Sequence, residues 1–423
     1  MDAFCYRDGE LYAEDVPLAQ IAASVGTPCY VYARSQLIAA YRTFEAALAG
    51  QEALVCYAVK ANANLAILAT FAALGAGFDI VSAGELERVV AAGGDPRRVV
   101  FSGVGKTGAE IERALAHDIL CFNVESPAEL DRLDAIAARM DKVARVSLRV
   151  NPDVDAGTHP YIATGLKENK FGIALAAARD LYRQAARYPH LQFMGVDCHI
   201  GSQLTELRPF ADALDRVLPL VAELRAQGVP IRHVDVGGGL GIRYREERPP
   251  TVEAYVGQVR EQLVAHGLAD LALLFEPGRA LVAAAGVLLT RVEYVKSTDT
   301  KHFAVIDAGM NDLIRPALYG AYQVIQTVRA RADTPGLDYD VVGPVCESAD
   351  VFGRSRHLRL QAGDLLVIRD AGAYGFAMAS QYNARPRPAE VLVEGNRFAV
   401  VRTRETLADL WRGESLPGWE APL

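Results

Sequence analysis

Lys60 directly follows ALVCYAV (residues 53–59), an apolar run that predicts a buried strand. Lysine is rarely fully buried, because its ammonium must stay hydrated or paired. One interpretation of Lys60 is therefore a side chain that extends from the strand end to water. The other is chemical, because a lysine amine can condense with an aldehyde to form a Schiff base.

Two other segments offer groups that would complete such chemistry. In DVGGGLGI (235–242), Gly237, Gly238 and Gly239 let backbone N–H groups approach an anion without obstruction by a Cβ atom. A flexible turn is the simpler interpretation of these glycines. FEPGR (275–279) places the carboxylate of Glu276 after another apolar run, where a surface ion pair with Arg279 is the simpler interpretation.

A lysine, an anion-binding glycine segment and a carboxylate together predict pyridoxal 5'-phosphate (PLP). The lysine would hold the aldehyde, and the carboxylate would keep the pyridine nitrogen protonated, so that the ring accepts electrons from a carbanion. His199, in HIGS, would lie against the ring, although a hydrogen-bonded core histidine fits this position equally well. The six cysteines show no metal-ligand spacing, so we expect no metal site.

These groups need a scaffold that brings the ends of distant strands together. Beyond Leu37, short apolar runs alternate with amphipathic helical patterns such as those at 83–93, 126–140 and 207–228. There are eight such runs, at 53–59, 77–81, 99–103, 119–124, 145–150, 193–199, 233–237 and 271–275. Eight strand–helix units in about 240 residues predict a (β/α)8 TIM barrel. The alternative is an open doubly wound sheet, but no G-x-G-x-x-G follows the first strand.

Catalytic groups of such barrels lie at the C-terminal ends of the strands. The eight expected ends carry Lys60, Ser82 with Glu85, Ser102, Asn123 with Glu125, Arg149 with Asn151, His199 with Ser202, Gly237 to Gly239, and Glu276 with Arg279. Solvation of loops would also explain polar residues there. The loops after strands seven and eight are the usual phosphate site of the fold, and the three glycines follow strand seven.

The alternation of apolar runs with helical patterns ends near residue 280. Short alternating runs such as VLLTRVEYVKST, KHFAVIDAG and LLVIRDAG predict a mainly antiparallel β domain. PCYVYA (28–33) is also strand-like, and we expect it to pair with this C-terminal sheet. The predicted organisation is an N-terminal segment (1–34) that joins the β domain, a PLP-binding barrel (35–280) and a C-terminal β domain (281–423).

The composition excludes several classes of partner. The net charge is −8, from 44 basic and 52 acidic residues, which disfavours nucleic acid or an anionic membrane as a partner. The first residues, MDAFCYRDGELYAEDV, lack the basic start and apolar core of a signal peptide. No apolar run approaches the roughly 20 residues of a membrane span. We therefore expect a cytoplasmic protein with reduced thiols.

Motifs of a known family occur in order along nearly the whole chain: YAVKAN, GFDIVSAGE, FSGVGKT, FNVES, LRVNP, GLKENKFGI, CHIGSQ, DVGGGLG, EPGR, GPVCESAD and AGAYGFAMASQYN. In these motifs the sequence resembles the bacterial diaminopimelate decarboxylases, which are fold-type III, alanine-racemase-like PLP enzymes. GLKENKFGI and FSGVGKT are specific to that enzyme. The resemblance implies a barrel plus a β domain and a homodimer with active sites shared across the interface. It also implies decarboxylation of meso-2,6-diaminopimelate to L-lysine and CO2, the last step of lysine biosynthesis.

The resemblance also implies roles for individual residues. Lys60 would form the internal aldimine with PLP, His199 would stack on the ring and Glu276 would pair with the ring nitrogen. The implied cofactor-binding set is Lys60, His199, Ser202, Gly237, Gly238, Gly239, Glu276, Pro277, Gly278, Arg279 and Tyr374.

For the substrate, the implied binding residues are Arg279, Arg315, Tyr319, Glu347 and Tyr374. Cys346 and Glu347 would enter from the partner subunit, Cys346 as the proton donor and Glu347 as a partner of the substrate ammonium. Without the resemblance, Arg315 would be interpreted as a surface arginine and Cys346 as an inert buried thiol.

Two alternatives stay open. The first is a related PLP decarboxylase of ornithine, arginine or carboxynorspermidine; ornithine and arginine carry no distal carboxylate for Arg315 to bind. The second is a non-catalytic homologue with a regulatory role, which should have lost Lys60 or Cys346. Both residues are present.

Overall fold

The computed structural model describes residues 2–155, 164–165, 169–331 and 334–419 and divides the chain into two compact units. The barrel unit comprises residues 34–285 and 372–377. The β unit comprises residues 1–33, 286–371 and 378–423. Both predicted architectures, a TIM barrel and a β domain made from the two chain ends, are therefore confirmed.

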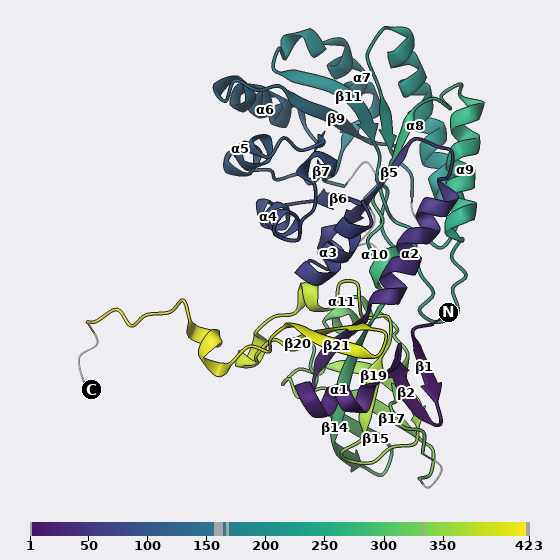
Figure 1. Ribbon diagram of the computed structural model, residues 1–423, viewed down its shortest axis with the longest axis vertical. Helices are drawn as coiled ribbons and strands as arrows, with labels where there is room; N and C mark the ends of the chain where they lie inside the picture. Colours follow the sequence, from purple (N-terminus) through teal and green to yellow (C-terminus); the bar gives the residue numbers. More distant parts are fainter. Residues whose placement is uncertain (1, 156–163, 166–168, 332–333, 420–423) are drawn as a thin grey trace. The chain divides into compact units, whose positions relative to one another are not determined.

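The barrel is a closed ring of eight parallel strands (Figure 1). In ring order these are β5 (Ala53–Ala58), β6 (Gly77–Ile80), β7 (Val99–Phe101), β8 (Cys121–Val124), β9 (Ala144–Asn151), β11 (Leu191–Asp197), β12 (His233–Asp235) and β13 (Ala272–Phe275). Pairing of β13 with β5 closes the ring. The short β10 (Ile173–Ala174) lies beside β9. All eight strands fall on the predicted apolar runs, and the closed ring excludes the open sheet.

Helices surround this ring. They are α2 (Arg34–Ala47), α3 (Leu65–Ala73), α4 (Ala83–Ala91), α5 (Gly108–Ala116), α6 (Pro127–Arg139), α7 (Leu175–Arg183), α8 (Arg208–Ala226), α9 (Val252–Ala265) and the single turn α10 (Arg279–Val282). Helix α2 precedes the first barrel strand, β5, yet packs between α3 and α9. The ring centres of Phe44 in α2 and Phe275 in β13 lie 6.4 Å apart. Helix α2 therefore takes the outer position that the short α10 cannot cover.

Side chains at the strand-to-helix loops set where several helices begin. Ser82, Thr107, Ser126 and Thr251 each accept a hydrogen bond from a backbone N–H in the first turn of the following helix. Such caps satisfy N–H groups that the helix itself leaves unpaired. These caps fix the point at which each of the four loops passes into its helix.

The β unit is built on one large sheet and one small one. The large sheet has the order β18 (Val351–Leu358), β17 (Leu337–Val342), β15 (His302–Ile306), β14 (Gly286–Ser297), β4 (Cys29–Ala33), β20 (Ala389–Glu394) and β21 (Arg397–Arg402), with β16 (Ile325–Thr327) and β19 (Leu365–Ile368) attached through β14. The small sheet is β1 (Phe4–Arg7), β2 (Glu10–Ala13) and β3 (Val16–Pro17). Helices α1 (Leu18–Val25) and α11 (Arg315–Tyr319) complete the unit.

Strand β4 holds the two chain ends together. It pairs antiparallel with β14 and parallel with β20, so the N-terminal strand lies inside the C-terminal sheet, as predicted. All five residues of β4 are buried. Pairing on both edges and burial on both faces explain its continuous apolar character. None of the described helices is long and apolar enough to cross a membrane.

Candidate active site

Lys60 lies in the turn η1 (Val59–Ala61), directly after β5, and its ammonium pairs with the carboxylate of Asp79 in the neighbouring strand β6. Asp79 is fully buried, whereas the Lys60 side chain keeps 36% of its exposure. Burial opposes the charge on this amine, but the nearby carboxylates of Asp79 and Glu276 overcome that effect and raise the pKa of Lys60. The side chain is thus held toward the barrel interior by a buried anion.

Glu276, at the end of β13, belongs to a cluster of buried carboxyl groups. Oxygens of Asp197, Asp235 and Glu276 all lie within 4.8 Å of one another. Burial, followed by the carboxylates of Asp235, Asp79 and Asp197, raises the pKa of Glu276 well above its usual range. Burial also raises the pKa of Asp235 to about 6, with a smaller contribution from Asp79 and against the hydrogen bond from the Gly237 N–H. Asn123 Nδ2 donates to Glu276 Oε1 over 3.3 Å. A positively charged group beside Glu276 would relieve the repulsion among these carboxylates.

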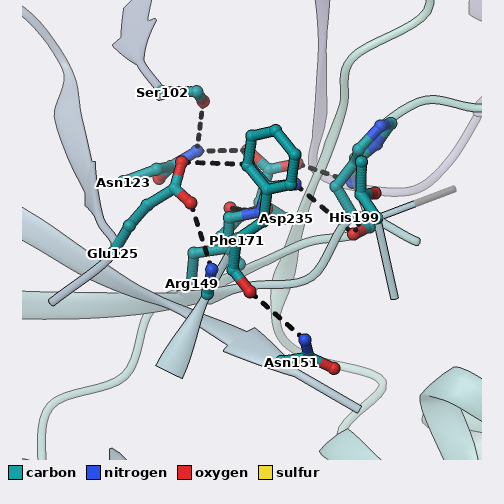
Figure 2. Close-up of polar contacts among 12 residues, drawn as sticks. Ser102, Asn123, Glu125, Arg149, Asn151, Phe171, His199 and Asp235 are labelled. Carbon is teal, nitrogen blue, oxygen red and sulfur yellow. Dashed lines mark hydrogen bonds and ion pairs between the residues drawn. The ribbon is translucent and has the colours of Figure 1, made fainter. Parts of the chain in front are cut away.

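Arg149, on β9, is the cation that compensates this region (Figure 2). Its Nη1 lies 3.0 Å from Glu125 Oε1, and its Nε lies 3.9 Å from Asp197 Oδ2. The side chains of Arg149, Glu125 and Asp197 keep at most 7% of their exposure. Buried ions of this kind are stable only when paired and hydrogen-bonded. Glu125 meets that condition by also accepting from the backbone N–H groups of Gly103 (2.9 Å) and Gly172 (3.1 Å).

The same arginine orders the segment around Phe171. Its guanidinium lies 5.0 Å from the centre of the Phe171 ring, and Asn151 Nδ2 donates to the Phe171 carbonyl over 3.2 Å. Figure 2 shows these contacts between β9 and the residues that follow it. This segment is the described part of GLKENKFGI (165–173); residues 166–168 lie outside the described residues.

His199 is half-buried after β11 and is held by the glycine segment. The Gly238 N–H donates to His199 Nδ1 over 3.1 Å. Burial, with the positive charges of Arg149 and Lys60 nearby, keeps the pKa of His199 well below its usual range. The ring is therefore neutral at pH 7, with Nδ1 as the acceptor and the proton on Nε2.

The glycine segment is a tightly packed turn. A Cβ at Gly238 would lie 2.2 Å from the Glu276 carbonyl oxygen, and one at Gly239 would lie 2.6 Å from that of Gly201. Gly237 has a φ of 65° and Gly239 a φ of 106°, which other residues adopt at a cost. The Gly237 N–H is occupied by Asp235 Oδ1 and that of Gly238 by His199. Of these three glycines, Gly239 is the one whose N–H has no acceptor among the described contacts, so it is available to an anion.

Arg279, at the start of α10, is buried and connects several predicted site residues. It donates to Ser202 Oγ over 2.9 Å and to Tyr244 Oη over 2.8 Å. Its guanidinium also lies 4.9 Å from the centre of the Tyr374 ring. Tyr374 has a φ of 55°, and its backbone N–H donates to Ala61, next to Lys60. A positive φ in a tyrosine is uncommon and is maintained here by the hydrogen bonds of residues 372–374 to the barrel.

The residues of the barrel unit fit PLP. Lys60 supplies an amine, Glu276 supplies a buried carboxyl that gains from a cationic ring nitrogen, and neutral His199 supplies a flat ring. Gly239 offers an N–H to the phosphate. Arg279 Nε and Asp79 Oδ1 are buried atoms without a hydrogen-bond partner among the described residues, which is typical of a site shaped for a polar ligand.

The remaining predicted residues belong to the β unit. Arg315 begins α11 and is buried, so the interpretation as a plain surface arginine is wrong. Its guanidinium lies 5.3 Å from the centre of the half-buried Tyr319 ring. The two side chains that the resemblance assigns to the distal end of the substrate therefore lie against each other.

Cys346 and Glu347 lie on an exposed loop of the β unit, between β17 and β18. Of the six cysteines, Cys346 is exposed while Cys29, Cys56, Cys121 and Cys198 are buried, so the interpretation as an inert buried thiol is also wrong. The buried Asp350 carboxylate shapes this loop by accepting from the Val345 and Met310 N–H groups, each over 2.7 Å.

A second contact of this loop comes from the segment Gln381 to Asn383. The Tyr382 hydroxyl donates to the Glu347 carboxylate, and the Cys346 N–H donates to Asn383 Oδ1 over 3.4 Å. Tyr382 itself is 45% exposed. The loop thus presents a thiol and a carboxylate side by side on the surface of its own unit.

Some residues at the predicted strand ends have structural tasks instead. Ser82 caps α4, and Glu85 accepts from the Val81 N–H in the same turn. The site also contains groups that the sequence did not predict: the carboxylates of Asp79, Asp197 and Asp235, and the ion pair of Arg149 with Glu125. For the three aspartates, the available signal was a carboxylate inside an apolar strand, in GFDIV, GVDC and HVDV. A charge at a buried strand position requires a partner, which the sequence does not identify.

Comparison with known families agrees with this site. Residues 34–283 match the pyridoxal binding domain of the pyridoxal-dependent decarboxylases. This match spans the barrel that carries Lys60, His199, the glycine segment and Glu276. The class that the fold and the site define is therefore that of the PLP-dependent decarboxylases, and PLP is the cofactor.

Within this class, similarity extends over the whole chain. Diaminopimelate decarboxylase from Pseudomonas aeruginosa is 60% identical over 98% of this chain and 99% of its own length. The crystal structure of diaminopimelate decarboxylase from Helicobacter pylori complexed with L-lysine has a TM-score of 0.90 at 43% identity, over 93% of this chain and 98% of that one. The L-lysine complex of the M. jannaschii enzyme has a TM-score of 0.94 at 38% identity, over 98% of both chains. The chain belongs to the diaminopimelate decarboxylase family.

Substitution of Arg149 by Gln should destabilise the barrel unit strongly. The buried carboxylates of Glu125 and Asp197 would lose their cation, which typically costs about 3–5 kcal/mol. The matched control is Arg179→Gln on α7, whose ion pair with Glu223 is partly exposed and should contribute about 0–1 kcal/mol. Urea unfolding at pH 7, followed by far-ultraviolet circular dichroism, measures both. Equal shifts for the two variants would contradict the assigned role of Arg149.

Proposed function

We propose that this chain catalyses the PLP-dependent decarboxylation of meso-2,6-diaminopimelate to L-lysine and CO2, as a homodimer with shared active sites. The observation that carries the proposal is the likeness to diaminopimelate decarboxylases at 44–60% identity over 94–99% of the chain. Structures of two further diaminopimelate decarboxylases, 43% and 38% identical to this chain and described as complexes with L-lysine, support lysine as the product. A cytoplasmic location stays a prediction from the sequence.

PLP supplies an electron sink that stabilises the carbanion left when CO2 departs from the α-carbon. Lys60 holds the cofactor, and the Asp79 carboxylate directs this side chain into the barrel mouth. Glu276 keeps a proton on the ring nitrogen, since a carboxylate surrounded by Asp235 and Asp197 gains most from a cationic neighbour. Neutral His199 would lie against the ring of the bound cofactor without adding a competing charge.

The substrate differs from other amino acids in its second amino-acid end, which carries both a carboxylate and an ammonium. Arg315 and Tyr319 are proposed to bind this distal carboxylate, together with Arg279 and Tyr374. Glu347 is proposed to bind the distal ammonium. Buried or pre-ordered arginines suit this task because a guanidinium matches a carboxylate in two parallel hydrogen bonds.

Cys346 is proposed to donate the proton that replaces CO2 on the α-carbon. Its exposure on the β unit supports a thiol that serves a neighbouring molecule rather than its own core. In this arrangement each active site takes Lys60 from one subunit and Cys346 with Glu347 from the other. A two-fold symmetric dimer makes two equal sites of this kind.

The alternative activities have less support. Arg315 is buried next to Tyr319, and a decarboxylase of ornithine or arginine would leave this cation without a distal carboxylate. A non-catalytic homologue would not need both Lys60 and Cys346. The likeness to the PLP complex of SrLDC, at 23% identity, indicates the shared fold alone.

Borohydride reduction of the PLP-loaded protein should fix the pyridoxyl group on Lys60. The Lys60 amine is directed into the barrel by Asp79, whereas the buried Lys106 is held by Glu129 and two backbone carbonyls. Proteolysis and mass spectrometry locate the label, with Lys106 as the internal control. A label on Lys106, or none on Lys60, contradicts the proposed attachment.

Release of CO2 should be fastest from meso-diaminopimelate in a panel that also contains ornithine and arginine. Arg315→Ala should weaken kcat/KM for diaminopimelate by roughly 2–5 kcal/mol, because a bound carboxylate would lose its buried partner. Arg329→Ala is the control, since Arg329 lies in the same unit with 72% of its side chain exposed. Faster turnover of ornithine or arginine by the unmutated protein would reject the proposed substrate.

Mixing two inactive variants tests the shared site. Lys60→Ala and Cys346→Ala dimers should each be nearly inactive. After subunit exchange, half of the dimers become hybrids with one doubly damaged and one intact site, so roughly a quarter of the unmutated activity should return. Native mass spectrometry verifies the exchange. If each chain used its own Cys346, complete exchange would restore no CO2 release.

A further inference from the structure

The C-terminal segment of the described chain, residues 405–419, is an apolar arm. It follows β21 and leads away from the sheet of its own unit, as the yellow end of the ribbon shows (Figure 1). Its exposed large apolar side chains are Leu407, Trp411, Leu416 and Trp419, with 64%, 55%, 86% and 82% of their surface exposed. The chain has two tryptophans, and both lie in this arm.

Such exposure is unusual for tryptophan in an isolated protein. Apolar side chains that cluster on a surface mark sites of association, and tryptophan is enriched at the energetically dominant positions of interfaces. A terminal segment without contacts is normally polar and poorly ordered. The arm is different, because it carries both tryptophans of the chain and exposes two leucines as well.

The base of the arm is fixed by specific contacts. Thr406 and Asp409 form a capping box that starts the turn η6 (Leu407–Trp411). Glu405, immediately before it, accepts from Gln381 Nε2 over 3.0 Å and from the Arg387 N–H over 2.9 Å. The direction in which the arm leaves the β unit is therefore set by hydrogen bonds.

These contacts also join the arm to the loop of Cys346 and Glu347. Gln381, which holds Glu405, immediately precedes Tyr382 and Asn383, and these two residues contact Glu347 and Cys346. The base of the arm and the reactive loop thus share one short segment, Gln381 to Asn383. If the loop enters the active site of the partner subunit, the arm begins at the same interface.

We propose that the arm lies on the partner subunit of the homodimer and packs Trp411 and Trp419 against its surface. The inference rests on the proposed function, because the shared active site places the neighbouring loop at the partner. A second copy of the chain is the occupant that this continuity selects. By two-fold symmetry each subunit extends one arm onto the other, so that the dimer contains two equivalent arm contacts.

Tryptophan fluorescence tests this inference without added labels, because all tryptophan emission comes from the arm. In the dimer the emission should lie at shorter wavelength and be at least threefold less sensitive to iodide than in the urea-unfolded chain. Dilution to monomer should shift it to longer wavelength and restore quenching. Emission that is quenched in the dimer as strongly as in urea, or shielded equally in the monomer, overturns the proposal.

Two variants measure the contribution of the arm to association. The double substitution Trp411→Ala with Trp419→Ala, and a chain that ends at Arg404, should each raise the dimer Kd at least tenfold in analytical ultracentrifugation. Tyr294→Ala on β14 is the matched control, since this aromatic residue of the same unit is 69% exposed, and its Kd should change less than twofold. Unchanged Kd values for both arm variants overturn the proposal.

The outcome of the arm experiments can be distinguished from the outcome of the mixed-dimer experiment on the shared active site. Restored activity in the mixed Lys60→Ala and Cys346→Ala dimers, with iodide-accessible tryptophans, would reject the arm contact and retain the shared site. Complete exchange without restored activity would reject the shared site itself. Shielded tryptophans in that case would show that the arm contacts the second copy in a dimer of another geometry.

Discussion

The compensation of buried charge in the barrel is the constraint on which the site depends. Asp79, Asp197, Asp235 and Glu276 place four buried carboxyl groups inside the ring of barrel strands or at its end. Two cations oppose them from fixed positions, Arg149 toward Asp197 and Glu125, and Lys60 toward Asp79. Because unpaired buried ions are costly, each of these side chains is restricted to one arrangement. The order of the barrel mouth follows from this restriction.

The excess of buried carboxyl groups over cations in the barrel also favours binding of the cofactor. Glu276 is surrounded by other carboxyl groups and accepts only weak hydrogen bonds, of 3.3 and 3.4 Å, from Asn123 and Ser102. A protonated ring nitrogen would give it a full positive charge at short range, so cofactor binding and charge compensation favour each other. His199 stays neutral because burial, and then the nearby charges of Arg149 and Lys60, hold the pKa of its ring well below the usual range. The neutral ring accepts from the Gly238 N–H.

The sequence predicted the parts that depend on local pattern and could not predict those that depend on pairing through space. Period-two and apolar runs located all eight barrel strands and the partner sheet of β4, and strand ends located Lys60, His199 and Glu276. The ion pair of Arg149 with Glu125 joins residues on neighbouring strands, and nothing in the local pattern selects it. Helix α2 was missed as the outer cover of β13 because it precedes the first strand. Strand β18, with its alternating charges in GRSR, gave no apolar signal.

The division into two units separates two chemical tasks. The barrel unit holds the groups that must stay rigid, because the stabilisation of a carbanion depends on fixed charges and a fixed ring. The β unit carries the residues proposed to act on the substrate. Arg315, Tyr319 and Glu347 would bind it, and Cys346 would donate a proton to it. The buried Asp350 gives the Cys346 loop its shape, while the thiol and the Glu347 carboxylate stay exposed. Hydrogen bonds within its own unit therefore set the shape of this loop and leave both side chains open to solvent.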